Sequence, residues 1–175
     1  MRGRHLSAVR AIDEVCFSRP WSTALWRREL ADPTRVHLVA VTDTVVGHAG
    51  LLSVLDEGHV TTVAVRPDLQ GRGVASRLLL ALFAAARSRE IAHLTLEVRA
   101  ADRRAQRLYG RFGFAPAGVR AAYYSDPTDD AVVMWCHDID RPEIAERLEL
   151  IRRGLAPITA HPDDAGAGDD DEVVR

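Results

Sequence analysis

Apolar residues recur every three or four positions at the start of the chain, which is the spacing of one helix face. The residues that share this face are Leu6, Val9, Ile12, Val15 and Cys16. The pattern stops before Pro20, because a proline disfavours helical geometry in the residue ahead of it. Ser22 is a favourable N-cap residue, so a second helix is predicted from there to the break at Asp32-Pro33.

Three short segments rich in β-branched residues come next, and each is bounded by a turn. They cover residues 37–42, 45–55 and 59–65, with turns at Asp43-Thr44 and at Asp56-Glu57-Gly58. β-Branched residues favour extended structure, and turns this short join strands that run antiparallel. The pattern therefore predicts an antiparallel meander of three strands.

The second half of the chain switches between helical and extended patterns. Helical spacing predicts helices at residues 74–89 and 102–112, and strict alternation of apolar and polar residues predicts a strand at residues 93–99. Two more strands are predicted at residues 119–123 and 132–136. The whole pattern is that of an α/β (α+β) domain whose mixed, mostly antiparallel sheet is flanked by helices.

Composition indicates one domain with two appendages. Of the 175 residues, 47% are apolar and 27% are charged, which is typical of a globular domain. We place this domain at residues 1–140. A further helix is predicted within residues 141–156, since Asp140 and Glu143 have the spacing of a capping box. Residues 157–175 are rich in Asp, Gly, Ala and Pro, and are predicted to form an acidic disordered tail.

The formal net charge of −2 hides an uneven distribution. Without the acidic tail from His161 onward, the chain has 19 acidic and 22 basic residues. This excess of base is compatible with an anionic ligand but too small to favour nucleic acid. Cys16 and Cys136 form no disulfide framework, and neither a signal peptide nor a membrane-spanning run is evident. We therefore expect a cytoplasmic protein that binds neither membrane nor nucleic acid directly.

A short glycine-rich loop at residues 70–75 (QGRGVA) is the first candidate for chemistry. It follows a predicted strand and opens a predicted helix. Glycines let backbone N–H groups approach an anion closely, and a helix N-terminus adds free donors and positive potential. A pyrophosphate would fit there, with Arg72 nearby. Glycine spacing alone is equally compatible with a plain strand-to-helix turn.

Glu97 and Tyr109 are the next candidates. Glu97 lies on the polar face of the strand at residues 93–99, and a carboxylate withdrawn from water can act as a general base near neutrality. An ion pair with Arg99 or another arginine is the structural alternative. Tyr109 lies on the following helix and could donate a proton to a leaving thiolate. Its alternative role is that of a half-buried packing aromatic.

Tyr123-Tyr124 and Asp56-Glu57 could together bind a cationic peptide end. Adjacent residues of a regular strand point to opposite faces, so we expect at most one of the two tyrosines to point inward. Cross-strand packing and turn solvation are the alternatives. The seven histidines form no HExxH motif or other ligand-like cluster, so no metal site is expected.

Three of these segments, in this order, resemble the GCN5-related N-acetyltransferase (GNAT) superfamily. They are residues 63–67 (VAVRP), residues 70–75 (QGRGVA) and residues 108–114 (LYGRFGF). The resemblance extends from residue 6 to residue 140. It implies the GNAT fold, acetyl-CoA as co-substrate and no metal.

Shorter matches narrow the resemblance. Pro20-Trp21-Ser22, Asp56-Glu57, residues 96–99 (LEVR) and Tyr123-Tyr124 are similar to the bacterial ribosomal-protein-alanine N-acetyltransferases of the RimI type. That family acetylates the N-terminal alanine of a small-subunit ribosomal protein. The resemblance thus implies a ribosomal protein N-terminus as acceptor and partner.

The resemblance also assigns roles to residues. The general base falls on Glu97 and the general acid on Tyr109. The implied acetyl-CoA contacts are Val63, Ala64, Val65, Gln70, Gly71, Arg72, Gly73, Val74, Ala75, Ser76, Asp102 and Tyr109. The implied acceptor contacts are Trp21, Glu57, Tyr123 and Tyr124. A backbone N–H group within residues 63–65 would stabilise the oxyanion.

The chain departs from the family at Asp102, where relatives usually carry Asn. Its charge would oppose the phosphates of acetyl-CoA unless it only caps the helix. Two alternatives stay open: an acetyltransferase for a small-molecule amine, and a catalytically silent acyl-CoA-binding module. An enclosed acceptor pocket favours the first, whereas an open groove favours a peptide. Asp102 is the only residue that supports the hypothesis of a silent module, and the presence of Glu97 and Tyr109 argues against it.

Overall fold

The structure is a computed structural model that describes residues 1–157, and most of the predicted acidic tail lies outside the described residues. Two helices open the fold, α1 (Leu6–Cys16) and α2 (Thr23–Ala31). The Ser22 hydroxyl accepts a hydrogen bond from the Leu25 N–H at 3.2 Å, which confirms the predicted N-cap.

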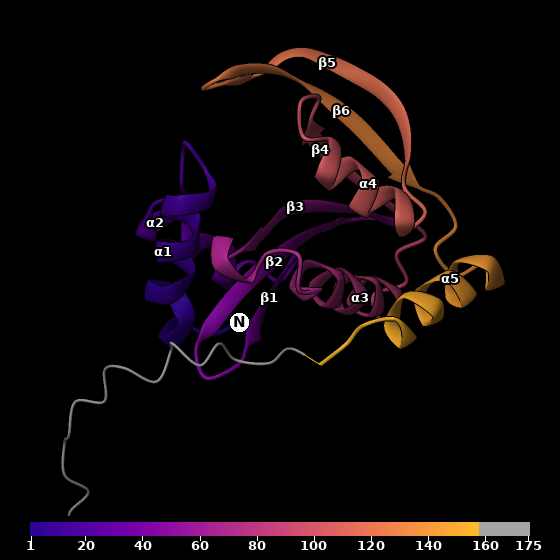
Figure 1. The fold of residues 1–175 in the computed structure, drawn as a ribbon, viewed down its shortest axis with the longest axis horizontal. Coiled ribbons are helices and arrows are strands. Elements are labelled where there is room, and N and C mark those ends of the chain that lie inside the picture. Colours follow the sequence, from indigo (N-terminus) through magenta and orange to yellow (C-terminus); the bar gives the residue numbers. More distant parts are fainter. Residues whose placement is uncertain (158–175) are drawn as a thin grey trace, which may run out of the picture.

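Six strands form one sheet in the order β1-β2-β3-β4-β6-β5 (Figure 1). β1 (Arg35–Val41), β2 (Val45–Val54) and β3 (Glu57–Val65) are the predicted antiparallel meander. β4 (His93–Arg99) pairs with β6 (Thr128–Cys136), and β6 pairs with β5 (Ala115–Ser125), in both cases antiparallel. Only β3 and β4 run parallel, which confirms the prediction of a mixed, mostly antiparallel sheet.

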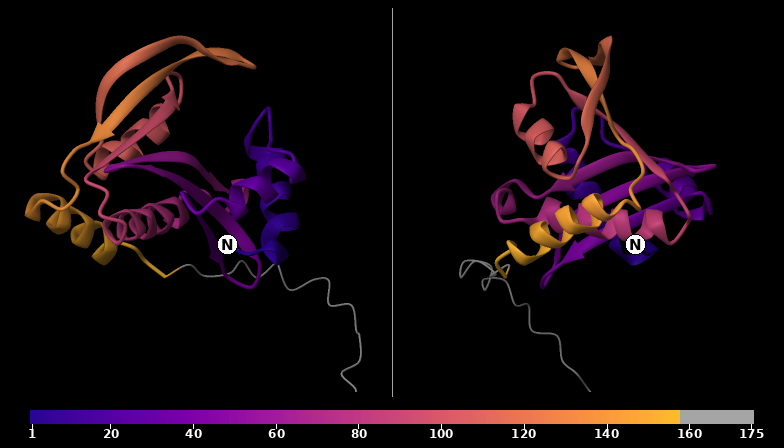
Figure 2. Two further views of the ribbon diagram at one scale, coloured as in Figure 1. Left: turned by 180° about the vertical axis from the view of Figure 1, so that it is seen from behind. Right: turned by 90° about the vertical axis from the view of Figure 1, so that its right-hand side faces the viewer.

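The sheet divides between β3 and β4. The two strands pair only from Glu57 to His59 and from His93 to Thr95, and beyond this they separate. The β2–β3 register shifts between Gly50 and Leu51, so β3 carries Thr61 as an extra residue where the separation begins. Bulges of this kind bend a strand. Figure 1 and Figure 2 show β4, β5 and β6 arching away from β1–β3 as a consequence.

Helices cover both faces of the sheet. On β2, Gly47 leaves space for Val74 and Leu78 of α3 (Val74–Arg87), whereas the next residue, His48, bonds to Asp13 of α1. Since neighbouring strand residues point to opposite faces, α1 and α3 lie on opposite sides. α4 (Arg103–Arg111) follows β4, and Phe112 at its end packs on Phe83 of α3, with ring centroids 5.9 Å apart. The core thus lies between the sheet and the α3–α4 layer.

The appended helix α5 (Pro142–Arg153) packs along α3 through the buried Leu148 and Ile151. The predicted capping box is wrong. Arg141 occupies the N-cap position with no side-chain capping bond, and Asp140 instead lies 3.5 Å from Arg87. Proline at the helix start already lacks the N–H group that a cap would satisfy. None of the helices formed by residues 1–157 is long and apolar enough to span a bilayer.

Candidate active site

Two pockets meet where β3 and β4 separate. The first has a volume of about 600 Å³ and lies beside α1, the α1–α2 loop and β5. The second has a volume of about 870 Å³ and lies between the N-terminus of α3, α4 and residues 154–157. Both are lined by Val63, Asp102, Ala105 and Tyr109. The pockets are therefore two arms of one site, and the shared residues mark their junction.

The glycine loop shapes the second pocket. Gly71 and Gly73 have φ of +83° and +80°, a left-handed geometry that glycine adopts without strain. A Cβ on Gly73 would also lie 2.8 Å from Leu155. Gly73 is the N-cap of α3, so the first N–H groups of that helix have no intrahelical acceptor. The predicted loop is thus a helix start with the geometry to receive an anion.

Arginines and Gln70 complete the wall of this pocket. The Gln70 side chain donates to the Val65 carbonyl at 3.1 Å and accepts from Arg104 at 3.4 Å, which ties the loop to β3 and α4. The guanidinium-bearing residues that line the pocket are Arg72, Arg104, Arg107 and Arg111. Phosphate groups prefer such a site. The predicted residues Gly71, Gly73, Ala75 and Ser76 line it, whereas Ala64 and Val74 are buried and do not.

The exposed edge of β3 faces the junction. The Val65 carbonyl accepts hydrogen bonds from the Cys16 thiol, at 3.4 Å, and from Gln70, so it points away from β2. Backbone groups two residues apart in a strand point to the same side. The N–H group of Val63 therefore points into the gap, where it can stabilise an oxyanion.

Tyr109 lies at the junction of the two pockets. Its ring packs on Phe114, with centroids 5.9 Å apart, so the predicted packing role is also present. Burial is the main cause of a strongly raised pKa of the phenol, and the negative charge of Asp102 adds to it. The hydroxyl therefore stays protonated at neutral pH and is available as a proton donor.

Glu97 lies in the first pocket with a side chain only 9% exposed. Its two carboxylate oxygens lie 3.2 Å from Arg120 and 3.0 Å from His59. The predicted ion pair is thus present, but its arginine is Arg120. Arg99 instead donates to the Pro127 and Asp126 carbonyls and stacks on Tyr124 at 4.2 Å.

Asp102 lines both pockets and caps α4. Its carboxylate accepts a hydrogen bond from the Ala105 N–H at 2.9 Å, in the geometry of an N-cap. An asparagine at this position would cap equally well. The capping role accounts for the aspartate without excluding an anionic ligand in the second pocket.

Three of the four predicted acceptor contacts line the first pocket: Trp21, Tyr123 and Tyr124. Both tyrosines face it, so the expectation that at most one points inward is wrong. β5 slips register between Arg120 and Tyr124, and Ala122 has φ of +50°, which breaks the alternation. The fourth contact, Glu57, lies at the opposite, paired end of β3 beside Val54 and His93, and lines neither pocket.

Sequence reasoning missed two features of the first pocket. Behind it, Asp13 accepts from Trp26 and bonds to His48, both at 2.8 Å, and this buried network holds the pocket wall. Across its mouth, the Ser18 hydroxyl donates to the Asp126 carbonyl at 2.7 Å, which joins the α1–α2 loop to the β5–β6 hairpin. The only sequence signal was that Asp13 is polar on an otherwise apolar helix face.

The structure offers no metal site within residues 1–157. No three His, Cys, Asp or Glu side chains cluster there as a metal site would require.

Comparisons with known proteins agree with this geometry. The model of the Acetyltransferase (GNAT) family matches residues 6–114. The [Ribosomal protein bS18]-alanine N-acetyltransferase of Escherichia coli (strain K12) is 31% identical over 131 residues, which cover 74% of this chain and 88% of that protein. The N-alpha-acetyltransferase RimI of Mycobacterium tuberculosis is 38% identical, over 66% of this chain and 74% of that protein.

A solved structure shares the fold as well. The crystal structure of the ribosomal-protein-S18-alanine N-acetyltransferase from Escherichia coli superposes with a TM-score of 0.72 at 29% identity, covering 79% of this chain and 90% of that one. Family model, relatives and architecture therefore agree. The chain belongs to the Acetyltransferase (GNAT) family and is an acetyl-CoA-dependent N-acetyltransferase.

Proposed function

We propose that the protein acetylates the N-terminal amine of a protein, with the N-terminal alanine of a small-subunit ribosomal protein as acceptor. The observation that carries the proposal is the position of Glu97 and Tyr109. They come from consecutive elements, β4 and α4, and both line the pocket that meets the anion-binding arm. The names of the relatives from Escherichia coli and Mycobacterium tuberculosis support the same chemistry.

The second pocket fits acetyl-CoA, which supplies the acetyl thioester when bound. The free N–H groups of α3 and the nearby arginines suit its pyrophosphate. The junction at Val63 and Tyr109 then suits its thioester end, because the acceptor arm opens there. Gln70 and Ser76 also line this pocket.

Glu97 accepts a proton from the acceptor amine, directly or through a water molecule. An α-amino group has a pKa of about 7.7–8.0, so a sizeable fraction is already neutral at physiological pH. Contacts with Arg120 and His59 hold the Glu97 carboxylate in place. As the nitrogen of the neutral amine bonds to the carbonyl carbon, Glu97 takes the proton that the nitrogen gives up, and the carbon–sulfur bond then breaks.

Val63 and Tyr109 act on the thioester, at its carbonyl oxygen and its sulfur. The Val63 N–H group donates a hydrogen bond to the carbonyl oxygen as negative charge develops there. The Tyr109 hydroxyl donates its proton to the departing sulfur. The hydroxyl is protonated at neutral pH, and solvent returns a proton to it after the thiol has left.

One observation favours a second candidate, a small-molecule amine as acceptor. The Ser18–Asp126 bond crosses the mouth of the first pocket and partly encloses it. Even so, Tyr123 is 49% exposed at the rim, which leaves room for a peptide to continue outward.

A thiol-release assay tests both candidates. Acetyl-CoA is incubated with an alanine-starting peptide, with the same peptide blocked at its N-terminus, and with alaninamide. We expect release only with the free peptide. Faster release with alaninamide than with the peptide would favour the small-molecule acceptor. Absence of release with all three would contradict the proposed function.

A further inference from the structure

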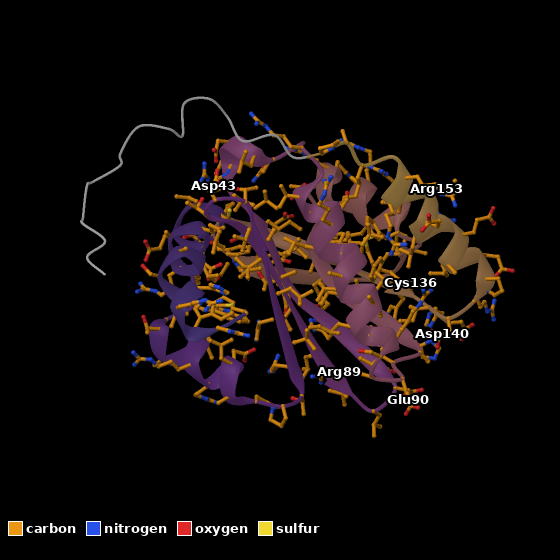
Figure 3. The ribbon with its side chains drawn as sticks, turned by 90° about the horizontal axis from the view of Figure 1, so that it is seen from below. Asp43, Arg89, Glu90, Cys136, Asp140 and Arg153 are labelled. Atoms are coloured by element: carbon orange, nitrogen blue, oxygen red, sulfur yellow. The ribbon has the colours of Figure 1, made fainter. Side chains whose placement is uncertain are left out.

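The segment after α5 borders the second pocket. α5 lies beyond residues 6–114, which the family model matches, and runs beside α3 in Figure 1 and Figure 3, where Arg153 marks its end. Its buried residues Leu148 and Ile151 account for its packing on the domain. Residues 154–157 continue past the helix and line the pocket together with the glycine loop and α4.

Two contacts hold residues 154–157 against the first turn of α3. The Leu155 side chain lies over Gly73, with a methyl carbon 2.8 Å from where a Cβ would be. The Arg77 guanidinium donates to the Ala156 carbonyl at 2.5 Å. Gly73 is therefore required twice, for its left-handed φ and for the space that Leu155 occupies. The contacts place residues 154–157 directly beside the anion-binding helix start.

The position along the pocket identifies the part of the cofactor concerned. In the proposed function, the thioester end of acetyl-CoA lies at the residues shared by both pockets, Val63 and Tyr109, and its pyrophosphate lies at the glycine loop. Residues 154–157 border the loop and are absent from the first pocket, so they lie toward the nucleotide end. Leu155, Ala156 and Pro157 are apolar, which suits a base or ribose better than a phosphate.

We propose that residues 154–157 form a wall of the nucleotide subsite and contact the adenosine portion of acetyl-CoA. This inference rests on the proposed use of the second pocket for acetyl-CoA. It gives the appended helix a role, since α5 carries the wall to the pocket and holds it against α3. The match to the family model ends at residue 114, before α5 begins.

The test compares Leu155→Ala with Leu150→Ala in the full-length protein. Leu150 is the matched control, because it lies one turn earlier and is 62% exposed. Binding of CoA is measured by calorimetry, and KM is measured for acetyl-CoA and for acetyl-pantetheine, which lacks the nucleotide. We expect Leu155→Ala to weaken CoA binding and raise the KM for acetyl-CoA roughly tenfold, with KM for acetyl-pantetheine and kcat unchanged.

Three results with Leu155→Ala would contradict the proposed contact between residues 154–157 and adenosine. They are unchanged CoA affinity, tighter CoA binding, and an equal rise in KM for acetyl-CoA and acetyl-pantetheine. Ala156→Asp is a second variant at an exposed position that does not threaten the core, and we expect its carboxylate to weaken CoA binding at low salt. Failure of the wild-type protein to bind CoA would instead reject the proposed function together with the wall.

Discussion

The imidazole of His59 lies 3.0 Å from the carboxylate of Glu97. His59 is the last residue of β3 that pairs with β4, and Glu97 lies two residues beyond its partner, Thr95. Arg120 holds the other carboxylate oxygen at 3.2 Å. Glu97 is therefore oriented before any acceptor arrives, on a side chain that is only 9% exposed. His59 is 33% exposed and lines neither pocket, so it contacts Glu97 from outside the site.

Replacement of Glu97 by glutamine tests the general base. The amide keeps the size of the side chain but cannot take a proton. We expect kcat to fall roughly 10²- to 10⁴-fold, the usual contribution of general-base catalysis, with acetyl-CoA affinity unchanged. Steady-state kinetics and calorimetry measure the two quantities. A wild-type kcat in Glu97→Gln would contradict the role.

The Tyr109→Phe variant tests the proton donor. The ring and its contact with Phe114 remain, so the melting temperature should stay close to that of the wild type. Turnover should fall by roughly 10²-fold or more, because no hydroxyl is left to protonate the departing sulfur. Tyr123→Phe serves as a comparison, since that ring is half exposed at the rim. A wild-type rate in Tyr109→Phe would leave the ring with a packing role only.

Removal of the Arg120 guanidinium should loosen the orientation of Glu97. Arg120 lies 3.2 Å from one carboxylate oxygen and is itself 58% exposed, so kcat/KM should fall only severalfold in Arg120→Ala, with acetyl-CoA affinity unchanged. Arg120→Lys keeps the positive charge and should restore much of the wild-type rate. Steady-state kinetics and calorimetry measure the two quantities. A wild-type kcat/KM in Arg120→Ala would show that the pair does not orient the base.

Two variants of Asp102 distinguish its role as a helix cap from the effect of its charge. Asp102→Asn should keep the cap and leave the melting temperature unchanged, while acetyl-CoA binding becomes somewhat tighter at low salt. Asp102→Ala should lower the free energy of unfolding by about 1 kcal/mol, the usual cost of a lost N-cap. Denaturant melts and CoA titrations distinguish the two effects. Weaker CoA binding in the asparagine variant would indicate that the charge assists the ligand.

His37 should make the fold sensitive to mild acid. Burial, with a smaller effect of Arg35, lowers its pKa to about 4. The unfolded chain takes up this proton near pH 6.5, and the folded chain only near pH 4, so stability is lost as pH falls through this window. The loss should reach up to about 1.4 kcal/mol per pH unit. Melting curves of the wild type and His37→Gln between about pH 7 and pH 4.5 should diverge as pH falls, and parallel curves would contradict this.

The sequence predicted those parts of the molecule whose signals are local. Helical periodicity and strand alternation located the elements to within a few residues, because each element buries one face. Gly71 and Gly73 identified the turn that opens α3, since their left-handed φ is a local requirement. The succession of β4 and α4 along the chain was also predicted from local patterns.

Features that depend on distant contacts were not predictable. The bulge before Tyr124 turned both tyrosines inward, and Glu57 proved to lie at the far end of its strand from the site. The contact between Glu97 and His59 depends on the parallel pairing of β3 with β4. The paired residues, such as Gly58 and Leu94, are 36 positions apart in the sequence, so no local pattern encodes the contact. Asp140 met Arg87 of another helix instead of capping its own.

The most direct test of the account locates the acetyl group. An alanine-starting peptide with one internal lysine is incubated with acetyl-CoA and the wild-type enzyme, and the product is fragmented in a mass spectrometer. The account predicts one acetyl group, on the alanine nitrogen, and strongly reduced product with Glu97→Gln. Acetylation of the lysine alone, or an equal yield from Glu97→Gln, would contradict it.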